Sequence, residues 1–368
     1  MSKLDELINE LCPDGVEYKP LEKVAKISNG KDHKHLDDGK FPVYGSGGIM
    51  RYASQCIYDQ VSVLIPRKGS IGNIFYVDTP FWTVDTIFYT KIDFEQINAR
   101  FFFHYLLTQN IENLNTAGGV PSLTKAILDK IEIPLPPLPV QEEIVRILDK
   151  FTELTAELTA ELTARKKQYE YYRDNLLTFD NEDFEWKTLG AITNLSRGVR
   201  VVRSQLNSQD KYPVYQNSLI PLGYFNKSNY PAKTTFIISA GAAGSVGYSD
   251  IDFWAADDCY CLVCPKWLDS RYLYHALNNQ QNYIFSQVRK ASIPRIGRDV
   301  VEKIKIPIPY PNDLEQSLKE QHRIVDILDR FDILCNDIST GLPAEIKTRQ
   351  KQYEYYRDKL LTFKEKLS

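Results

Sequence analysis

One motif is written twice in this chain. Residues 165–179 read RKKQYEYYRDNLLTF and residues 349–363 read RQKQYEYYRDKLLTF, so the two copies differ at only two positions. The identical run KQYEYYRD is far outside chance, and self-similarity at a fixed offset is the signature of a repeated structural unit. We therefore predict a chain built from two copies of one unit.

Weaker echoes precede each copy of the motif in the same order. EYKPLEKVAKISNG is answered by EWKTLGAITNLSRG, FWTVDTIFYTKI by FWAADDCYCLVC, and RFFFHYLL by RYLYHALN. KIEIPLPPLPVQEEIVRILDKF is answered by KIKIPIPYPNDLEQSLKEQHRIVDILDRF. The helical parts match well and the parts before them match poorly. The helices are therefore predicted to share one task, and the other parts to perform different versions of a second task.

Each copy of the motif lies on a predicted long helix. From Val140 to Phe179 there is no proline or glycine, and apolar residues recur at the three- and four-residue steps of an amphipathic helix. The second copy supplies a partner from about Leu314 to Phe363, where Gly341 and Pro343 should kink or break the helix. The residues predicted to pack in this helix pair or against its partners are Leu154, Leu158, Leu162, Tyr169, Tyr172, Phe331, Tyr353 and Tyr356.

A four-residue repeat lies inside the first helix. TELTAELTAELTA, residues 152–164, repeats the unit TAEL. Four residues rise about 6 Å and overshoot one helical turn by about 40°, so a unit can be gained or lost without interrupting the helix. The leucines are expected to be helix-packing core, and the segment is also interpreted as a spacer that sets the distance between globular parts.

The remaining sequence predicts two mixed α/β domains. The chain has 368 residues with an ordinary globular composition, 43% hydrophobic and 25% charged. Strand-like runs such as VSVLIP, TTFIIS and CYCLVC alternate with glycine-rich turns. Proline-rich stretches restrict the backbone where each domain meets its helix. The predicted boundaries are 1–139 for the first globular domain, 140–180 for the central helix, 181–313 for the second globular domain and 314–368 for the C-terminal helix.

Basic side chains gather beside glycine and serine in both globular regions, where backbone and arginine can approach DNA. The net charge of −3 argues mildly against nucleic-acid binding, and any one of these residues alone is more often an ordinary surface charge. As two sets, they favour DNA contact. The candidates are Lys31, Lys34, Arg51, Arg67, Lys68 and Lys125, with His33 and His35 beside them, and in the second region Arg197, Arg200, Arg203, Lys227, Arg289, Lys290, Arg295 and Arg298.

The sequence contains no recognisable catalytic or metal-binding motif. The chain has no phosphate-binding G-x-x-x-x-G-K-[ST] loop and no Asn-Pro-Pro-Tyr methyltransferase motif. CYCLVC is interpreted as buried thiols in a strand rather than a metal site, since it lacks a second ligand pair. We predict no catalytic residue and no metal ligand. The absence of a signal-like start or a membrane-spanning apolar run leads us to expect a cytoplasmic protein.

A known family matches this arrangement. CPDGVEYKPLEKVAKISNG, IPLPPLPVQEEIVRILDKF and the duplicated QYEYYRD resemble the specificity subunits of type I restriction–modification enzymes over essentially the whole chain. The TAEL array resembles the variable spacer of the EcoR124-like subgroup. The resemblance implies two target-recognition domains, each reading half of a split double-stranded DNA site, and an antiparallel coiled coil formed by residues 141–179 and 321–363.

The resemblance also implies partners. These are two adenine methyltransferase subunits, which use S-adenosylmethionine, and two motor-nuclease subunits, which use ATP and Mg²⁺; no cofactor is expected on this chain itself. The two domains differ in sequence, so an asymmetric DNA site is expected. Three alternatives stay open: a self-contained DNA-cleaving enzyme with fused recognition domains, a coiled-coil scaffold that binds proteins only, and a recognition subunit of a methyltransferase-only defence system.

Overall fold

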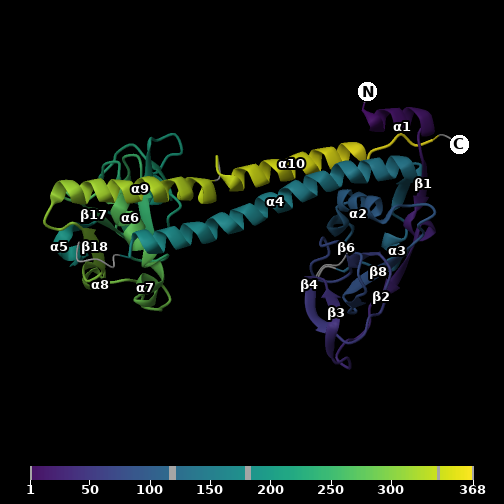
Figure 1. Cartoon of the computed structure of the whole chain (residues 1–368), viewed down its shortest axis with the longest axis horizontal. Coiled ribbons are helices and arrows are strands. Elements are labelled where there is room, and N and C mark those ends of the chain that lie inside the picture. The colour runs from purple at the N-terminus through teal and green to yellow at the C-terminus, as the bar shows by residue number, and fades with distance from the viewer. Residues whose placement is uncertain (1, 116–121, 179–183, 338–339, 367–368) are drawn as a thin grey trace. The chain divides into compact units, whose positions relative to one another are not determined.

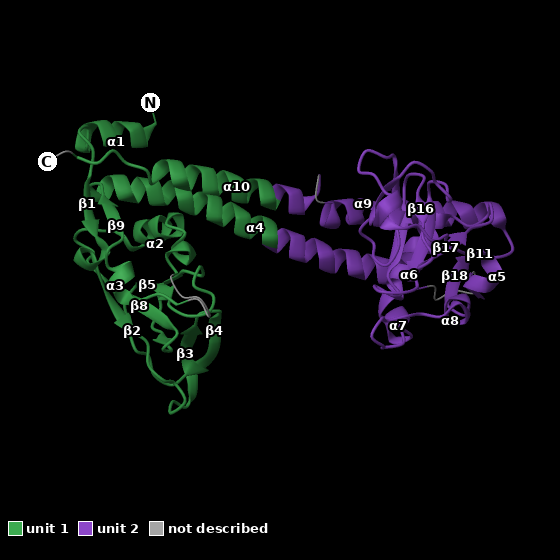
Figure 2. Ribbon diagram, turned by 180° about the vertical axis from the view of Figure 1, so that it is seen from behind, with its two compact units in different colours: residues 1–159, 346–368 green, residues 160–345 purple. Residues whose placement is uncertain are grey.

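The computed structural model describes residues 2–115, 122–178, 184–337 and 340–366, and the chain forms two compact units (Figure 2). Unit 1 comprises residues 1–159 and 346–368, and unit 2 comprises residues 160–345. The helix α4 (Leu138–Leu176) contributes its first part to unit 1 and its last part to unit 2. Each unit therefore combines a globular head with helical segments from both halves of the chain.

The head of unit 1, called head 1, precedes α4 in the chain (Figure 1). Its elements are α1 (Lys3–Leu11), β1 (Glu17–Pro20), η1 (Leu21–Lys23), β2 (Ala25–Asn29), β3 (Asp38–Gly45), β4 (Gly48–Ala53), β5 (Ser62–Pro66), β6 (Phe75–Val77), β7 (Trp82–Thr83), β8 (Ile87–Ile92), α2 (Ala99–Thr108), η2 (Ile111–Leu114), α3 (Lys125–Leu128) and β9 (Glu132–Leu135).

The head of unit 2, called head 2, lies between α4 and α9 in the chain. Its elements are β10 (Phe184–Thr188), α5 (Leu189–Ile192), β11 (Asn194–Arg197), η3 (Arg203–Gln205), β12 (Tyr212–Tyr215), β13 (Gly223–Phe225), β14 (Thr234–Ile238), β15 (Val246–Ser249), β16 (Trp254–Ala255), β17 (Cys259–Val263), α6 (Ser270–Asn279), α7 (Gln281–Ser286), α8 (Arg298–Glu302) and β18 (Lys305–Pro309).

The two heads have the same strand topology. The antiparallel order β2-β8-β5-β6 in head 1 corresponds to β11-β17-β14-β15 in head 2. A second sheet, β4-β3-β7, corresponds to β13-β12-β16, and each contains one parallel pair. The pairs β1-β9 and β10-β18 also correspond. The predicted repeat therefore extends through the globular parts, although their side chains differ.

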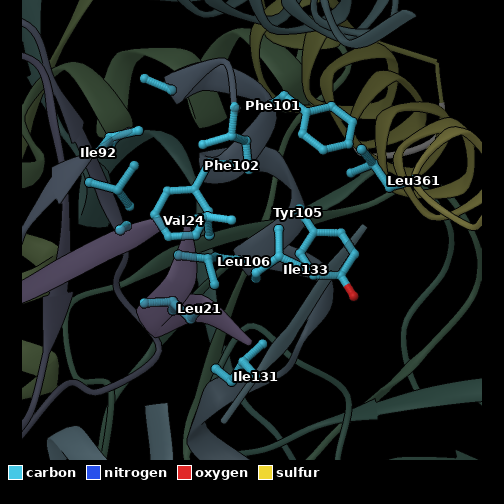
Figure 3. Packing of buried hydrophobic residues seen from close by; sticks show 14 of the residues in the cluster. Leu21, Val24, Ile92, Phe101, Phe102, Tyr105, Leu106, Ile131, Ile133 and Leu361 are labelled. Atoms are coloured by element: carbon cyan, nitrogen blue, oxygen red, sulfur yellow. The ribbon is translucent and has the colours of Figure 1, made fainter. Parts of the chain in front are cut away.

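One helix packs against the main sheet of each head, and the two helices carry the matching segments RFFFHYLL and RYLYHALN. In head 1, Phe101, Phe102 and Leu106 of α2 are fully buried among residues of η1 and β9 (Figure 3). In head 2, α6 buries Tyr272 and Leu273 in the same way. Asn98 and Asp269 cap these helices by accepting hydrogen bonds from the first backbone N–H groups, a role that suits their short polar side chains.

The second long helix is divided as its sequence predicted. α9 (Leu314–Asn336) ends before the glycine and α10 (Leu342–Leu360) begins after it, with Pro343 in the first turn of α10, where proline is tolerated. A Cβ on Gly341 would lie 2.4 Å from the carbonyl oxygen of Ile333, so the close return of the chain requires glycine. Phe179, the predicted last residue of the first helix, and the predicted domain boundary after residue 180 lie outside the described residues.

The helices of each unit run antiparallel. In unit 1, Phe151 of α4 stacks on Tyr356 of α10, and Leu361 joins the buried cluster that holds Ile144. In unit 2, Tyr172 of α4 stacks on Phe331 of α9, and Leu177 joins the cluster that holds Leu328. Figures 1 and 2 show α4 and α10 side by side. Along each pair, residue numbers rise on one helix as they fall on the other.

Parts of the proline-rich stretches before the long helices are strands, which the sequence did not reveal: Pro134 lies in β9, and Pro307 and Pro309 lie in β18. β9 pairs with β1, and β18, which reads KIPIP, pairs with β10. Each strand has a single neighbour, so N–H groups on its other side need no partner in the sheet, and proline can occupy those positions. These two-stranded pairs lead directly into α4 and α9.

Unit 1 is closed by its own last residues. The backbone N–H of Val16 donates to the carbonyl oxygen of Lys364 at 2.9 Å, and the N–H of Lys366 donates back to Val16 at 2.9 Å. Tyr18 donates a hydrogen bond from its hydroxyl to the carbonyl oxygen of Phe363 at 3.1 Å.

Among the described residues, no helix is both long and apolar enough to cross a membrane.

Substituting Gly15 tests this closure. Gly15 has φ of +107°, and a Cβ there would lie 2.4 Å from the carbonyl oxygen of Lys364. We expect Gly15→Ala to lower the free energy of unfolding of unit 1 by about 2–3 kcal/mol, since both the backbone conformation and the contact exclude a side chain. Thermal unfolding measures this. Gly47→Ala is the matched control, because Gly47 has no atom within 4 Å of the added Cβ. Equal melting temperatures for the two variants would contradict the expectation.

Candidate nucleic-acid interface

Each head has one sheet edge at which loops from several strands meet, called here the loop edge. In head 1, β2 and β5 end where β8 begins, since Asn29 pairs with Phe88 and Pro66 with Ile87. In head 2, β11 and β14 end where β17 begins. A cavity opens at each loop edge, about 660 Å³ in head 1 and about 310 Å³ in head 2.

Five of the six candidate lysines and arginines of head 1 lie at or beside this edge, and Lys34 is the one among them that lines the cavity. Lys31 and Lys34 follow β2, and Arg67 and Lys68 follow β5. Lys125 starts α3. The segment before α3 is held at the loop edge, because the N–H of Leu123 donates to the carbonyl oxygen of Arg67 at 2.8 Å. The cavity is lined by Lys34 and His33 together with the β3–β4 turn residues and Met50.

Two of the candidate arginines of head 1 are already engaged by the protein. Arg51 lies on β4 and donates from Nη2 to the carbonyl oxygen of Leu36 and to Asp38 Oδ1, both at 2.9 Å. The guanidinium of Arg67 lies over the ring of Phe88, 5.1 Å from its centre. Arg51 and Arg67 are half-buried, whereas the other candidate basic residues of both heads are exposed. Arg51 thus anchors the loop after β2.

In head 2 the fold brings three candidate arginines together. Arg197 ends β11, and Arg289 and Arg295 face each other on a short ribbon. All three line the 310 Å³ cavity. Five other candidates do not line it: Arg200 and Arg203 follow β11, Lys227 follows β13, Lys290 lies within the ribbon loop, and Arg298 pairs with Glu302 at 2.7 Å. Contact of all these residues with DNA stays a prediction.

Exposed apolar side chains accompany the basic ones, and the sequence analysis did not single them out. In head 1, Ile49, Met50 and Tyr52 of β4 are 49%, 61% and 51% exposed. In head 2, Ile220 and Val199 are 78% and 57% exposed. Apolar side chains of this kind can contact the methyl group of thymine. The signal was available in the consecutive apolar residues Ile49 and Met50, which break the alternation of a half-buried strand.

The predicted helix-packing residues form a joint between head 1 and its helices. His104 of α2 shares a hydrogen bond with the hydroxyl of Tyr353 at 2.8 Å, and its other ring nitrogen lies 3.1 Å from Asp149 Oδ1. Arg100 donates to the same carboxylate oxygen at 2.8 Å. The rings of Phe151 and Tyr356 stack with centres 5.2 Å apart. The joint ties one helix of the head to both long helices.

Unit 2 has an equivalent joint, except that Nδ1 of His275 has no hydrogen-bond partner among the described residues. His275 lies 2.6 Å from Asp329 Oδ1, and Arg271 donates to that oxygen at 2.7 Å and to Asp332 at 3.0 Å. Tyr172 stacks on Phe331 with ring centres 5.4 Å apart, and Tyr169 lies 6.2 Å from the same ring. Tyr353 and Tyr356 in unit 1 therefore have their counterparts in Tyr169 and Tyr172, contributed by the other copy of KQYEYYRD.

Burial and hydrogen bonding act in opposite directions on the joint carboxylates. Burial acts to raise the pKa of Asp149 and of Asp329, but hydrogen bonds from the neighbouring histidine and arginine outweigh it. Both pKa values therefore lie below the ordinary value of 3.8. The carboxylates are ionised at neutral pH and hold the arginines in place.

A buried glutamine fixes the start of each long helix. Gln141 Oε1 accepts from the N–H of Asn98 at 2.7 Å, while its Nε2 donates to the carbonyl oxygen of Pro136 at 2.7 Å. Gln321 accepts from the N–H of Asp269 at 2.8 Å and donates to Trp267. These glutamines, and the joint arginine, histidine and aspartate residues, were not predicted from the sequence. Their signal was their recurrence at equivalent places in both copies.

The leucines of the TAEL segment are only partly covered. Leu154 and Leu158 in unit 1 and Leu162 in unit 2 are half-buried and belong to neither large buried cluster.

The middle tyrosine of each KQYEYYRD copy is largely exposed. Tyr171 is 66% exposed and Tyr355 is 62% exposed. Equivalent residues therefore present the same side chain to solvent in both units.

The prediction of buried thiols in a strand is confirmed for two of the three cysteines of the cluster, whereas Cys264 follows the strand and is half-buried. Cys259 and Cys261 lie on β17 and are fully buried. Burial raises the pKa of Cys259 and of Cys264 to about 12, so these thiols stay protonated. No cluster of histidine, cysteine and carboxylate residues suited to a metal ion occurs in the part of the chain that the structure describes.

Comparison with known proteins gives a consistent result. A family model described as the type I restriction modification DNA specificity domain matches residues 13–165 and 181–348. A putative type I restriction enzyme specificity subunit of Haemophilus influenzae is 35% identical over 387 residues, covering 95% of this chain and 96% of that protein. The EcoR124I/EcoR124II specificity subunit of Escherichia coli is 38% identical over 268 residues, covering 64% of this chain and 63% of that protein.

Solved structures share the fold. The crystal structure of a type I restriction–modification S subunit from M. genitalium superimposes with a TM-score of 0.68 at 18% identity, covering 94% of this chain and 96% of that one. A chain from a structural study of complex assembly in a type I restriction–modification system gives 0.56 at 16% identity, covering 96% and 98%. Because the family model matches most of the chain and the Haemophilus relative spans nearly all of it, this chain belongs to the family of type I restriction–modification DNA specificity proteins.

Proposed function

We propose that this chain is the non-catalytic specificity subunit of a type I restriction–modification complex and that its two heads each read one half of an asymmetric bipartite DNA site. The observation that carries the proposal is that the two heads have the same strand topology but different residues at their loop edges. Shared strand order lets both heads approach DNA in the same manner. Different side chains at the two edges make the two half-sites differ.

The joints support the assignment of partners. KQYEYYRD occurs in both units. In each copy the first and third tyrosines lie at the joint, the third stacks on a phenylalanine of the neighbouring long helix, and the middle tyrosine is exposed. Two equivalent exposed surfaces suit two copies of one partner. We assign these to two adenine methyltransferase subunits, which would carry S-adenosylmethionine, with two motor-nuclease subunits supplying ATP- and Mg²⁺-dependent chemistry.

The helix α4 is proposed to set the distance between the half-sites. It runs from head 1 into unit 2 as one helix of 39 residues, and the TAEL segment lies between Phe151 and Tyr169, the residues that hold its two joints. Its length is about 58 Å at 1.5 Å per residue. This assignment follows the spacer interpretation of the EcoR124-like subgroup.

Mapping of methylated adenines tests the proposed function. The chain, assembled with the methyltransferase subunit of its own system, is incubated with a random-sequence DNA library and the modified positions are sequenced. We expect one motif with two different half-sites separated by a fixed unspecified spacer. The methyltransferase without this chain is the control and should give no such motif. Absence of a bipartite motif, or DNA cleavage by this chain alone with Mg²⁺, would contradict the proposal.

A further inference from the structure

The cavity of head 2 is built around a two-arginine ribbon. The N–H of Arg289 donates to the carbonyl oxygen of Arg295 at 2.8 Å, and the N–H of Arg295 donates back at 3.2 Å. Residues that exchange both hydrogen bonds stand directly opposite each other, with side chains on the same face. The ribbon is fixed to the end of β14, because the N–H of Ile296 donates to Ser239 at 2.9 Å and the N–H of Gly241 donates to Pro294 at 3.1 Å.

The two opposed arginines form no ion pair among the described residues, although Asp258 and Asp299 line the same cavity. In the described part of the chain, neither Arg289 nor Arg295 has a side-chain hydrogen bond, whereas Arg100 and Arg271 at the joints are each bound to a carboxylate. Like charges placed directly opposite across a ribbon are destabilising. A pair of this kind on a fixed ribbon is unfavourable for folding, and it is best explained by acceptors supplied from outside the chain.

The other residues that line the cavity of head 2 indicate the chemistry of those acceptors. Asp258, Asp299 and Gln287 share the cavity with the three arginines. Carboxylates repel a phosphate, so a mixed lining is poorly suited to the DNA backbone. It suits the major-groove edge of a guanine–cytosine pair, where guanine N7 and O6 accept hydrogen bonds and the cytosine amino group donates one.

We propose that the Arg289–Arg295 ribbon reads a guanine in the half-site of head 2, with an aspartate of the same cavity accepting from the paired cytosine. The proposal rests on the proposed function and adds the base that head 2 selects. The corresponding cavity of head 1 contains no arginine and is lined by His33, Lys34 and Met50. The preference attributed to the Arg289–Arg295 pair therefore concerns the half-site of head 2.

Methylation of randomised sites by the assembled complex measures this preference. We expect Arg289→Ala and Arg295→Ala each to reduce the preference for guanine at one position of one half-site by about 10- to 100-fold, leaving the other half-site unchanged. Arg295→Lys should behave like Arg295→Ala, because lysine keeps the positive charge but lacks the paired N–H donors of the planar guanidinium group. Lys303→Ala is the matched control, since Lys303 is an exposed basic residue of head 2 that does not line the cavity.

A modified base distinguishes a hydrogen bond to guanine from a charge interaction with the DNA backbone. Replacing that guanine by 7-deazaguanine removes the N7 acceptor, so it should weaken the wild-type complex and leave the Arg295→Ala complex unaffected. Uniform weakening of all sequences, with a smaller dependence of affinity on salt, would assign the arginines to phosphates and overturn this inference while leaving the proposed function intact. Absence of any bipartite motif for the wild-type complex would overturn both.

Discussion

Replacing Asp329 with alanine is expected to lower the free energy of unfolding of unit 2 by about 2–4 kcal/mol. The substitution leaves His275, which is completely buried, and Arg271, whose side chain is 18% exposed, without the carboxylate oxygen that both contact. Removing one partner of a buried ion pair typically costs about 3–5 kcal/mol. We place the effect lower, because the side chain of Asp329 is 32% exposed and Asp332 remains bound to Arg271.

Calorimetry together with amide hydrogen exchange in α6 measures this effect. Asp326→Ala is the matched control, because Asp326 lies on the exposed face of the same helix and has no ion pair among the described residues. It should leave both readouts unchanged. Protection of α6 in the Asp329→Ala variant equal to that in the control would show that the joint does not hold head 2 on α9.

The same substitution has a defined dependence on pH. The pKa of Asp329 in the folded chain lies below 3.8, so its contribution to stability is present above that value and is lost as the pH falls through the folded pKa. The difference in stability between the wild-type chain and Asp329→Ala should therefore be full at neutral pH and shrink below about pH 4.

Much of the architecture was predictable because the chain repeats itself. The duplicated KQYEYYRD and the apolar spacing of α4 predicted paired long helices, and Gly341 with Pro343 predicted their interruption. Helix and strand periodicity are local properties that a single sequence carries. The strand-like runs VSVLIP, TTFIIS and CYCLVC accordingly predicted β5, β14 and β17.

Pairing between distant residues was not predictable in the same way. The proline-rich strands β9 and β18 lack strong strand propensity and exist because β1 and β10 lie beside them. Arg51 and Arg289 were equal as candidates by composition, yet one is bound to Asp38 and the other faces Arg295. Only the folded chain decides which positive charge is neutralised internally and which is left for a ligand.

Deleting one TAEL unit, residues 155–158, is expected to change the DNA spacer and to leave both half-sites unaltered. Tyr169 follows Phe151 by 18 residues, so the deletion brings the two joints on α4 closer by four residues without removing any joint residue. The change is about 6 Å and 40° along the helix. One base pair of DNA rises about 3.4 Å and turns by roughly 35°, so the spacer should shorten by about one or two base pairs.

The original site should lose methylation by at least about 100-fold, because only one head at a time can then make its base contacts, each worth about 1–3 kcal/mol. The existing break between α9 and α10 means that the shortened α4 has no continuous partner helix to oppose the change. Sequencing of methylated adenines provides the measurement. Replacing residues 155–158 by four alanines keeps the helix length and should keep the original spacer. Altered half-sites with an unchanged spacer would refute the spacer role of α4.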